Sequence, residues 1–250
     1  MSYEELLYLA PYIISLILSL GVFIYAWQHR HVRGATSYSW FAGGQTLTIL
    51  GFILELVSPD LRGKILWDKF QWLTDTFLVI LPFLFFSIEF SEYRLRRPSV
   101  VWSVLFVFLG TFTVLLFTDN FHHLLYPNPS LSAAQPFPEL KYDFTYIIYI
   151  YALFYLYGAN IYGISLLIKR ALQPQILYRL QYLTIIFGFL IPLVLSFFSL
   201  ANIKIASQRD ITPISLAIGN LIVAWGLFRY GLFDIVPIAR ERIVENINDP

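Results

Sequence analysis

The sequence predicts an all-α membrane protein: a seven-transmembrane helix bundle with its N-terminus outside and its C-terminus in the cytoplasm. Apolar residues make up 58% of the 250 residues and charged residues only 13%, whereas soluble domains hold about 25% charged residues. The apolar residues gather in seven stretches, each close to the roughly 20 residues that a helix needs to cross a bilayer. Lysine and arginine are divided unevenly between the segments that join these stretches.

Each apolar stretch is predicted to form one membrane helix, because a backbone that crosses a bilayer must satisfy its own hydrogen bonds. The predicted helices are residues 6–27, 37–57, 67–90, 100–117, 144–168, 180–200 and 211–233. Glu4 and Glu5 precede the first stretch, where a cleavable signal peptide would carry basic residues, so we expect this helix to be retained. Residues 1–235 are assigned to one membrane domain and residues 236–250 to the start of a cytoplasmic signalling helix or linker.

The orientation follows from the lysines and arginines of the joining segments. The side that carries the C-terminus holds Arg30, Arg33, Arg94, Arg96, Arg97, Lys169, Arg170, Arg179, Arg229, Arg240 and Arg242, and the other side holds Arg62, Lys64, Lys69, Lys141, Lys204 and Arg209. Cytoplasmic loops of membrane proteins are enriched in these residues, which favours a cytoplasmic C-terminus. The odd number of helices then puts the N-terminus outside. The longest joining segment, residues 118–143, lies on the outer side and is predicted to be a binding loop.

Several chemical functions find no support in the sequence. Cysteine is absent, which excludes disulfides and thiolate chemistry. His122 and His123 are the best metal candidates, yet they lack the spacing and the third ligand of a zinc site. No phosphate-binding glycine loop occurs, and the net charge of +1 indicates no nucleic-acid partner. We therefore expect neither catalysis nor a cofactor in these residues.

Polar residues inside the predicted helices are the informative positions, because burying an ionisable side chain in a bilayer costs several kcal/mol. In the second helix, Gly44, Thr48 and Gly51 form a stripe of small residues that ends at Glu55. Such a stripe lets two membrane helices approach closely. In the third helix, a step of about 100° per residue places the acidic residues on one face, which includes Asp75.

The predicted fifth helix is rich in tyrosine on two faces. One face holds Tyr142, Tyr146, Tyr149, Tyr157 and Asn160, and the opposite face holds Tyr151, Tyr155 and Tyr162. An amide is costly toward lipid, so Asn160 favours the first face as the one that points into the bundle.

These positions together predict a ligand pocket that opens to the outside. Its predicted lining is Glu55, Trp67, Gln71, Asp75, Tyr146, Tyr149 and Asn220. The expected ligand is an unidentified small molecule or lipid. The alternative is that these side chains only form hydrogen bonds between helices and hold the bundle together.

The final stretch, from residue 211 onward, is predicted to carry a signal out of the membrane. Its apolar run is followed by Asp234, Pro237 and a charged segment with apolar residues at helical spacing. Such a segment suits a homodimer or a following domain, so we assign output roles to Arg229, Asp234, Pro237 and Arg240. The alternative is a solvated tail that only anchors the last helix at the lipid headgroups.

Four segments resemble the N-terminal seven-helix region of bacterial sensor histidine kinases, a module also found before diguanylate cyclases. They are ILWDKFQWLTDTFLVILPFLFFSIEFSEY, TDNFHHLLYPNP, LYRLQYLTIIFGFLIPLV and DITPISLAIGNLIVAWGLFRYGLFDIVPIAR. The last is the most specific, because its D-x-T-P start and its R-x-x-L-F-D-x-V-P-x-A-R finish occur together. The resemblance implies a signal-receiving, multi-pass domain of the bacterial inner membrane. In the family a PAS domain and a kinase or another output usually follow, and this sequence ends about where such a domain would begin, as a sensor fragment or a stand-alone module would.

The sequence therefore predicts a membrane sensor that passes a signal through its last helix to a cytoplasmic output. The alternative is a small-molecule transporter or a channel subunit. A transporter needs a continuous polar path, whereas the inner half of the predicted bundle offers mainly Glu89 and Arg229.

Overall fold

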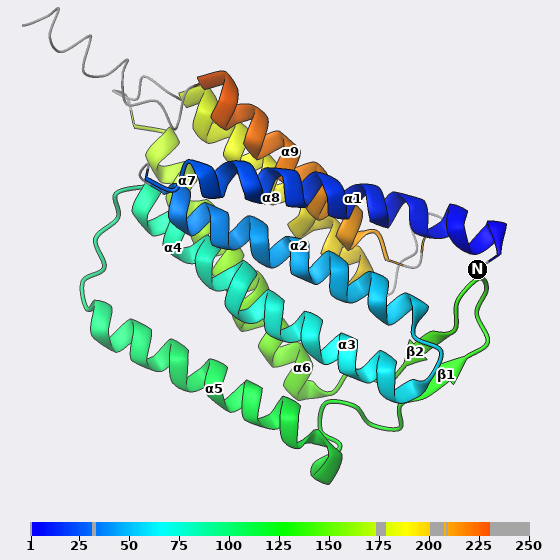
Figure 1. Ribbon diagram of the computed structural model, residues 1–250. Helices are drawn as coiled ribbons and strands as arrows, with labels where there is room; N and C mark the ends of the chain where they lie inside the picture. The colour runs from blue at the N-terminus through cyan, green and yellow to red at the C-terminus, as the bar shows by residue number, and fades with distance from the viewer. Residues whose placement is uncertain (1, 32–33, 174–178, 201–207, 209, 231–250) are drawn as a thin grey trace, which may run out of the picture.

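The computed structural model describes residues 2–31, 34–173, 179–200, 208 and 210–230, and these form a helical bundle with one small hairpin (Figure 1). In chain order the elements are α1 (Tyr3–Gln28), α2 (Ala35–Val57), α3 (Leu61–Thr74), the π-helical segment η1 (Asp75–Ile80), α4 (Leu81–Phe90), α5 (Pro98–His122), β1 (Ser130–Ser132), β2 (Glu139–Lys141), α6 (Tyr146–Tyr151), the π-helical segment η2 (Ala152–Tyr157), α7 (Gly158–Ala171), α8 (Arg179–Leu200) and α9 (Thr212–Tyr230).

Six helices in the described residues are long and apolar enough to cross a membrane. They are Tyr3–Gln28, Ala35–Val57, Leu61–Phe90, Pro98–His122, Tyr146–Ala171 and Arg179–Ser199. The predicted seventh span corresponds to α9, whose described apolar part, Thr212–Gly226, is shorter than a full span. The third helix begins at Leu61 rather than at residue 67, because the Asp60 side chain caps it by accepting a hydrogen bond from the Gly63 amide at 3.0 Å.

The helices pack around α2 and α9. Helix α1 lies against α2 and α9, α8 lies along α9, and α7 packs between α4 and α8 (Figure 1). Helix α5 lies at the edge of the bundle and is attached by aromatic contacts. Among these contacts, the rings of Phe112 and Tyr151 stack with centroids 3.6 Å apart, and those of Phe85 and Trp102 stack at 4.4 Å.

Glycines allow the closest helix contacts. A Cβ atom added at Gly44 would collide with the carbonyl of Leu78 in η1, and one added at Gly51 would lie 2.9 Å from the Phe70 ring. The predicted stripe of small residues in the second helix is thus confirmed as a close contact with the third helix. Gly188 and Gly219 give α8 and α9 a similar backbone-to-backbone approach.

Each π-helical segment changes which residues lie on the same side of its helix before and after it. A π-helical turn holds more residues than an α-helical turn, so a fixed step of about 100° per residue fails across it. Tyr151 and Tyr155 are buried, whereas Tyr146 is 88% exposed and Tyr149 is 43% exposed. The predicted inward face is therefore wrong for Tyr146, and the predicted opposite face is wrong for Tyr151 and Tyr155, which are buried.

The segment predicted as one long loop, residues 118–143, contains regular structure. Helix α5 continues to His122, and β1 pairs antiparallel with β2, with Leu131 opposite Leu140. We call the end of the bundle that holds this hairpin, the end of α2 and the start of α3 the hairpin end (Figure 1). The opposite end, which holds the α1–α2 and α4–α5 connections, is called the basic end.

Candidate functional site

Two cavities lie in the half of the bundle near the hairpin end. The larger, of about 990 Å³, is lined by residues of α2, α3, the hairpin and the start of α6; we call it the hairpin cavity. The smaller, of about 290 Å³, lies between α2, η1, η2, α7, α8 and α9; we call it the core cavity. Phe144, Ser199 and Asp210 line both cavities, so the two cavities adjoin at these residues.

The hairpin cavity is strongly acidic. The acidic residues that line it are Glu55, Asp68, Glu139, Asp143 and Asp210, and Lys141 is the one basic residue among its described lining. Carboxylates gathered on low-dielectric walls produce a negative potential, which attracts cations and repels anions.

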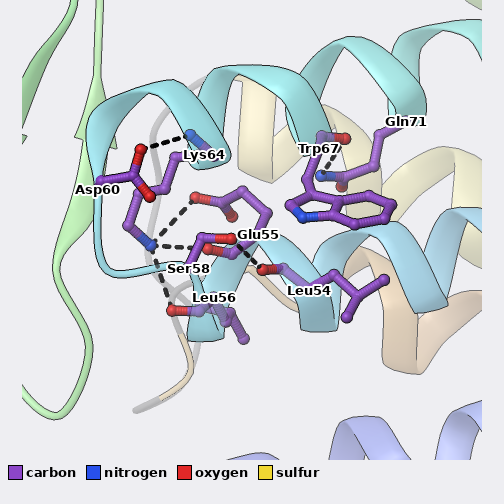
Figure 2. A network of polar contacts seen from close by, with 9 residues as sticks. Leu54, Glu55, Leu56, Ser58, Asp60, Lys64, Trp67 and Gln71 are labelled. Atoms are coloured by element: carbon purple, nitrogen blue, oxygen red, sulfur yellow. Dashed lines mark hydrogen bonds and ion pairs between the residues drawn. The ribbon is translucent and has the colours of Figure 1, made fainter.

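Glu55 is held in a network with Lys64 (Figure 2). The Lys64 Nζ atom lies 3.7 Å from the Glu55 carboxylate, and the two side chains are 0% and 2% exposed. Lys64 Nζ also donates to the backbone carbonyls of Glu55 at 2.7 Å and Leu56 at 3.2 Å. A cation at the last carbonyls of a helix satisfies acceptors that have no partner within the helix and offsets the helix dipole. Lys64 therefore terminates α2 as well as pairing with Glu55.

Asp68 anchors the segment that follows α5. Its Oδ2 atom accepts hydrogen bonds from the hydroxyls of Tyr126 at 2.6 Å and Tyr142 at 3.0 Å, and from Trp72 Nε1 at 3.2 Å. Burial raises the pKa of Tyr126 and of Tyr142 well above the usual value of 10.0, and the nearby Asp68 carboxylate raises both further. Both phenols therefore stay protonated and act as donors at neutral pH.

The predicted metal candidates instead help to shape the end of α5. The buried Asp119 carboxylate accepts from the backbone amides of Leu125 at 2.7 Å and Tyr126 at 3.4 Å. His122 Nδ1 accepts from the Leu124 amide, and its Nε2 lies 3.1 Å from the Thr118 hydroxyl. His123 ends the helix with a left-handed backbone, at φ of 50°. No group of three metal-ligating side chains occurs in the described part of the chain.

Asp75 and Gln45 provide polar groups to the core cavity. The Thr48 hydroxyl donates to Asp75 Oδ1 at 2.7 Å and lies 2.9 Å from the Thr74 hydroxyl. Gln45 lies one turn before Thr48 on α2 and is 2% exposed, and its Oε1 atom has no hydrogen-bond partner among the described residues. A buried amide oxygen without a hydrogen-bond donor thus belongs to a residue that lines a largely apolar cavity.

Asp210 connects three helices at the point where the two cavities meet. Its Oδ1 atom accepts from the Ser199 hydroxyl of α8 at 2.6 Å and from the Thr212 amide at the start of α9 at 2.8 Å. Its backbone carbonyl accepts from the Tyr12 hydroxyl of α1 at 2.9 Å. A change at either cavity that moves Asp210 would therefore also move the start of α9.

The chain matches the family described as the N-terminal 7TM region of histidine kinase over residues 11–237, nearly its whole length. The chain belongs to this family. The chain is a multi-pass membrane protein and a sensor module, and in this family the 7TM region is the sensory, non-catalytic part of the histidine kinase. A comparison with curated proteins found no match.

The predicted pocket residues of this 7TM region are not gathered in one place. Glu55, Gln71 and Tyr149 line the hairpin cavity, and Asp75 lines the core cavity. The remaining three predicted residues, Trp67, Tyr146 and Asn220, line neither cavity.

Each of these three has another environment. Trp67 packs edge-on against Phe70 at 5.7 Å, and Tyr146 is 88% exposed. Asn220 is buried and donates to Ser19 of α1 at 3.3 Å. Of the predicted output residues, Arg229 lies in α9, whereas Asp234, Pro237 and Arg240 lie outside the described residues.

Three residues of the 7TM region that matter at the cavities were not predicted as lining or pairing residues. Lys64 lies before the predicted start of the third helix, so the sequence places it only among the cations of a joining segment. Asp210 precedes the last predicted helix, and the sequence marks it only as the first residue of the D-x-T-P motif. Gln45 could have been recognised from the sequence as a candidate, because an amide in an apolar helix needs a partner or a ligand.

Proposed function

We propose that the chain is a receptor domain that detects an extracellular or membrane-borne ligand at the hairpin end and passes the signal along α9 to a cytoplasmic output. The output is a PAS-linked histidine kinase or a diguanylate cyclase, joined through residues 236–250. The observation that supports this proposal most directly is the position of Asp210. Asp210 lines both cavities, and its carboxylate accepts a hydrogen bond from the backbone amide of Thr212 at the start of α9. Membership of a family of sensor modules supports a sensory role of this kind.

The proposed orientation places the hairpin end outside and the basic end in the cytoplasm of a bacterial cell, with the bundle in the inner membrane. Its support is the positive charge at the basic end, where Arg30, Arg94, Arg96, Arg97, Lys169, Arg170 and Arg179 occur. Cytoplasmic segments are enriched in such residues. Helix α9 then begins outside, beside the cavities, and completes the seventh span on its way inward.

The proposed relay is a shift between two packings of α8 and α9. The two helices are in backbone contact at Gly188 and Gly219, so a small rotation or slide of one displaces the other. A ligand that binds one packing more tightly favours it in proportion to the difference in affinity. The extension beyond α9 is proposed to pair with its copy in a homodimer, which would carry this difference to the output.

The structure favours a receptor over a transporter or channel. On the basic side of the core cavity, the Phe189 ring lies 5.1 Å from Phe41, 4.4 Å from Phe83 and 5.9 Å from Phe86. A translocation path needs polar groups or water along its length. Phe41 and Phe189 of this cluster also line the core cavity, so the rings extend its apolar wall rather than a polar path.

A fusion to a histidine kinase output tests the proposal. We expect Glu55→Gln and Asp75→Asn each to change the autophosphorylation rate of the fused kinase while membrane insertion stays normal, because each alters a charge beside the cavities. Phe106→Leu is the control, since Phe106 lies on the exposed face of α5 and is 50% exposed. Unchanged kinase activity and signal response in both acidic-residue variants would refute a sensory role for the cavities.

A further inference from the structure

We propose that the core cavity binds a small apolar amine as its ammonium ion, with Asp75 as the counter-ion and Gln45 as a second acceptor. The proposal rests on the receptor function above and names the chemical class of its ligand. Three observations support it: the buried amide oxygen of Gln45 has no hydrogen-bond partner among the described residues, the charged residues of the cavity lining are acidic, and the other walls are apolar.

The buried amide points to a ligand that donates hydrogen bonds. Gln45 is 2% exposed and lines the core cavity, and its Oε1 atom has no partner in the described chain. A buried carbonyl oxygen without a donor is costly, and most such groups in proteins find a partner. A ligand with an N–H or O–H group at this place removes that cost.

The charge of the lining points to a cation. Asp75 and Asp210 are the charged residues of the described lining, and no lysine, arginine or histidine joins them there. Thr48 donates to Oδ1 of Asp75, and Oδ2 accepts no hydrogen bond from the described residues. A carboxylate within a bilayer is stabilised by pairing with an opposite charge. An ammonium group has enough donors to serve Asp75 Oδ2 and Gln45 Oε1 together.

The remaining walls suit an apolar body of limited size. Phe41, Val79, Ile80, Phe189, Leu193 and Leu216 line the same space. Ring faces also attract cations that lie close to them. The volume of about 290 Å³ is at the lower end of the range of usual ligand pockets. A single substituted ring or a short branched chain is therefore the expected body.

The proposed route to the core cavity selects for the same charge. It runs through the hairpin cavity, which shares Phe144, Ser199 and Asp210 with the core cavity. The hairpin cavity carries five acidic residues against one lysine, and one of the five, Glu55, is paired with the buried Lys64. Such a vestibule concentrates cations and disfavours anions. A carboxylate of the same size as the amine is thus excluded twice, by the vestibule and by Asp75.

Calorimetric titration of the purified chain in lipid nanodiscs tests the proposal with three probes of one shape. Phenethylamine is expected to bind, phenethyl alcohol to bind at least about tenfold more weakly because it lacks the charge, and phenylacetate not to bind. Equal binding of the amine and the alcohol, or no binding of the amine, would overturn the proposal.

Two variants with matched controls locate the site. Asp75→Asn and Gln45→Leu are each expected to weaken phenethylamine binding, about tenfold or more for Asp75→Asn. The controls are Asp143→Asn and Gln71→Leu, which alter the same residue types in the hairpin cavity only and should change the affinity by less than about threefold for lack of direct contact. Circular dichroism and thermal unfolding establish that each variant is folded.

The pattern of losses decides the outcome. If the controls lose as much affinity as Asp75→Asn, or if Asp75→Asn and Gln45→Leu bind as the wild type does, the core cavity is not the amine site. The binding experiment needs no output domain, so its failure leaves the kinase-fusion test of the receptor function intact. Conversely, normal amine binding with an unresponsive fusion would count against the receptor function alone.

Discussion

Lys64 shows how one side chain can hold a local structure that the sequence pattern does not reveal. It pairs with Glu55 and donates to the last carbonyls of α2, and it is fully buried. Glu55 was recognisable as a costly charge within an apolar helix. Its partner was not, because pairing depends on the turn at Asp60 that folds α3 back against α2.

We predict that Lys64→Met lowers the free energy of unfolding by about 3–5 kcal/mol, because it leaves both the Glu55 carboxylate and the end of α2 without their cation. Glu55→Gln should cost less, since Lys64 keeps its two carbonyl acceptors. Thermal unfolding in detergent measures both. Lys141→Met, on the exposed side of β2, is the control and should have little effect. Equal stability of Lys64→Met and the wild type would contradict the assigned role.

Tyr126 and Tyr142, which anchor the hairpin end, make the stability of the fold depend on pH. Their folded-state pKa values lie well above 10.0, so both are protonated when folded at a pH where the unfolded chain ionises. Above about pH 10 the unfolded state then binds fewer protons than the folded state, and stability falls as pH rises. The stabilisation that the two protonated phenols provide is fully present below about pH 10.

Unfolding midpoints measured between pH 8 and pH 11 test this linkage. We expect a decline above about pH 10 in the wild type and a shallower decline in the double variant Tyr126→Phe/Tyr142→Phe. Tyr146→Phe is the matched control, because Tyr146 is 88% exposed. A decline of the same steepness in the double variant and the wild type would show that other groups cause it.

At the scale of the elements, the contact between α2 and η1 sets how the second and third helices pack. Gly44 faces the Leu78 carbonyl so closely that a Cβ atom there would collide with it. The stripe of small residues made this contact predictable from the sequence. The π-helical segments were not predictable in the same way, because they pack against residues that are distant in sequence, as η1 packs against Gly44.

Gly44→Ala is therefore expected to destabilise the bundle by about 1–3 kcal/mol, since the backbone of η1 must move to admit the methyl group. Gly21→Ala provides the control, because no neighbour lies within 4 Å of the added Cβ atom. Alanine there should be neutral or slightly stabilising through its higher helix propensity. Thermal unfolding of both variants measures the difference, and an unaffected Gly44→Ala would show that the two helices are not in tight contact.

At the scale of the whole molecule, hydrophobic length and charge were sufficient to predict a helical membrane bundle. Six helices long and apolar enough to cross a membrane were confirmed among the described residues, because each is set by its own run of apolar residues. The β hairpin and the two cavities were beyond such reasoning. They depend on how helices that are distant in sequence meet, and Asn220 shows this, since its predicted place in a pocket is instead a contact with Ser19.

The proposed orientation predicts which end reacts with reagents from outside. The chain contains no cysteine, so single cysteines can be placed without removing others. A membrane-impermeant maleimide should label Ser130→Cys, at the hairpin end, in intact spheroplasts. It should label Ser99→Cys, at the basic end, only after the membrane is opened; both positions are exposed. The reverse pattern would invert the orientation and place the cavities on the cytoplasmic side.

The most direct test of the receptor account is the autophosphorylation rate of a histidine kinase fused after residue 250, measured in nanodiscs as phenethylamine is added. We expect a change of at least about fivefold in the wild type, the lower end of usual coupling between two sites. In Asp75→Asn we expect a much smaller change at the same amine concentration. A constant kinase rate in wild-type protein that calorimetry shows to be saturated with the amine would contradict the receptor account.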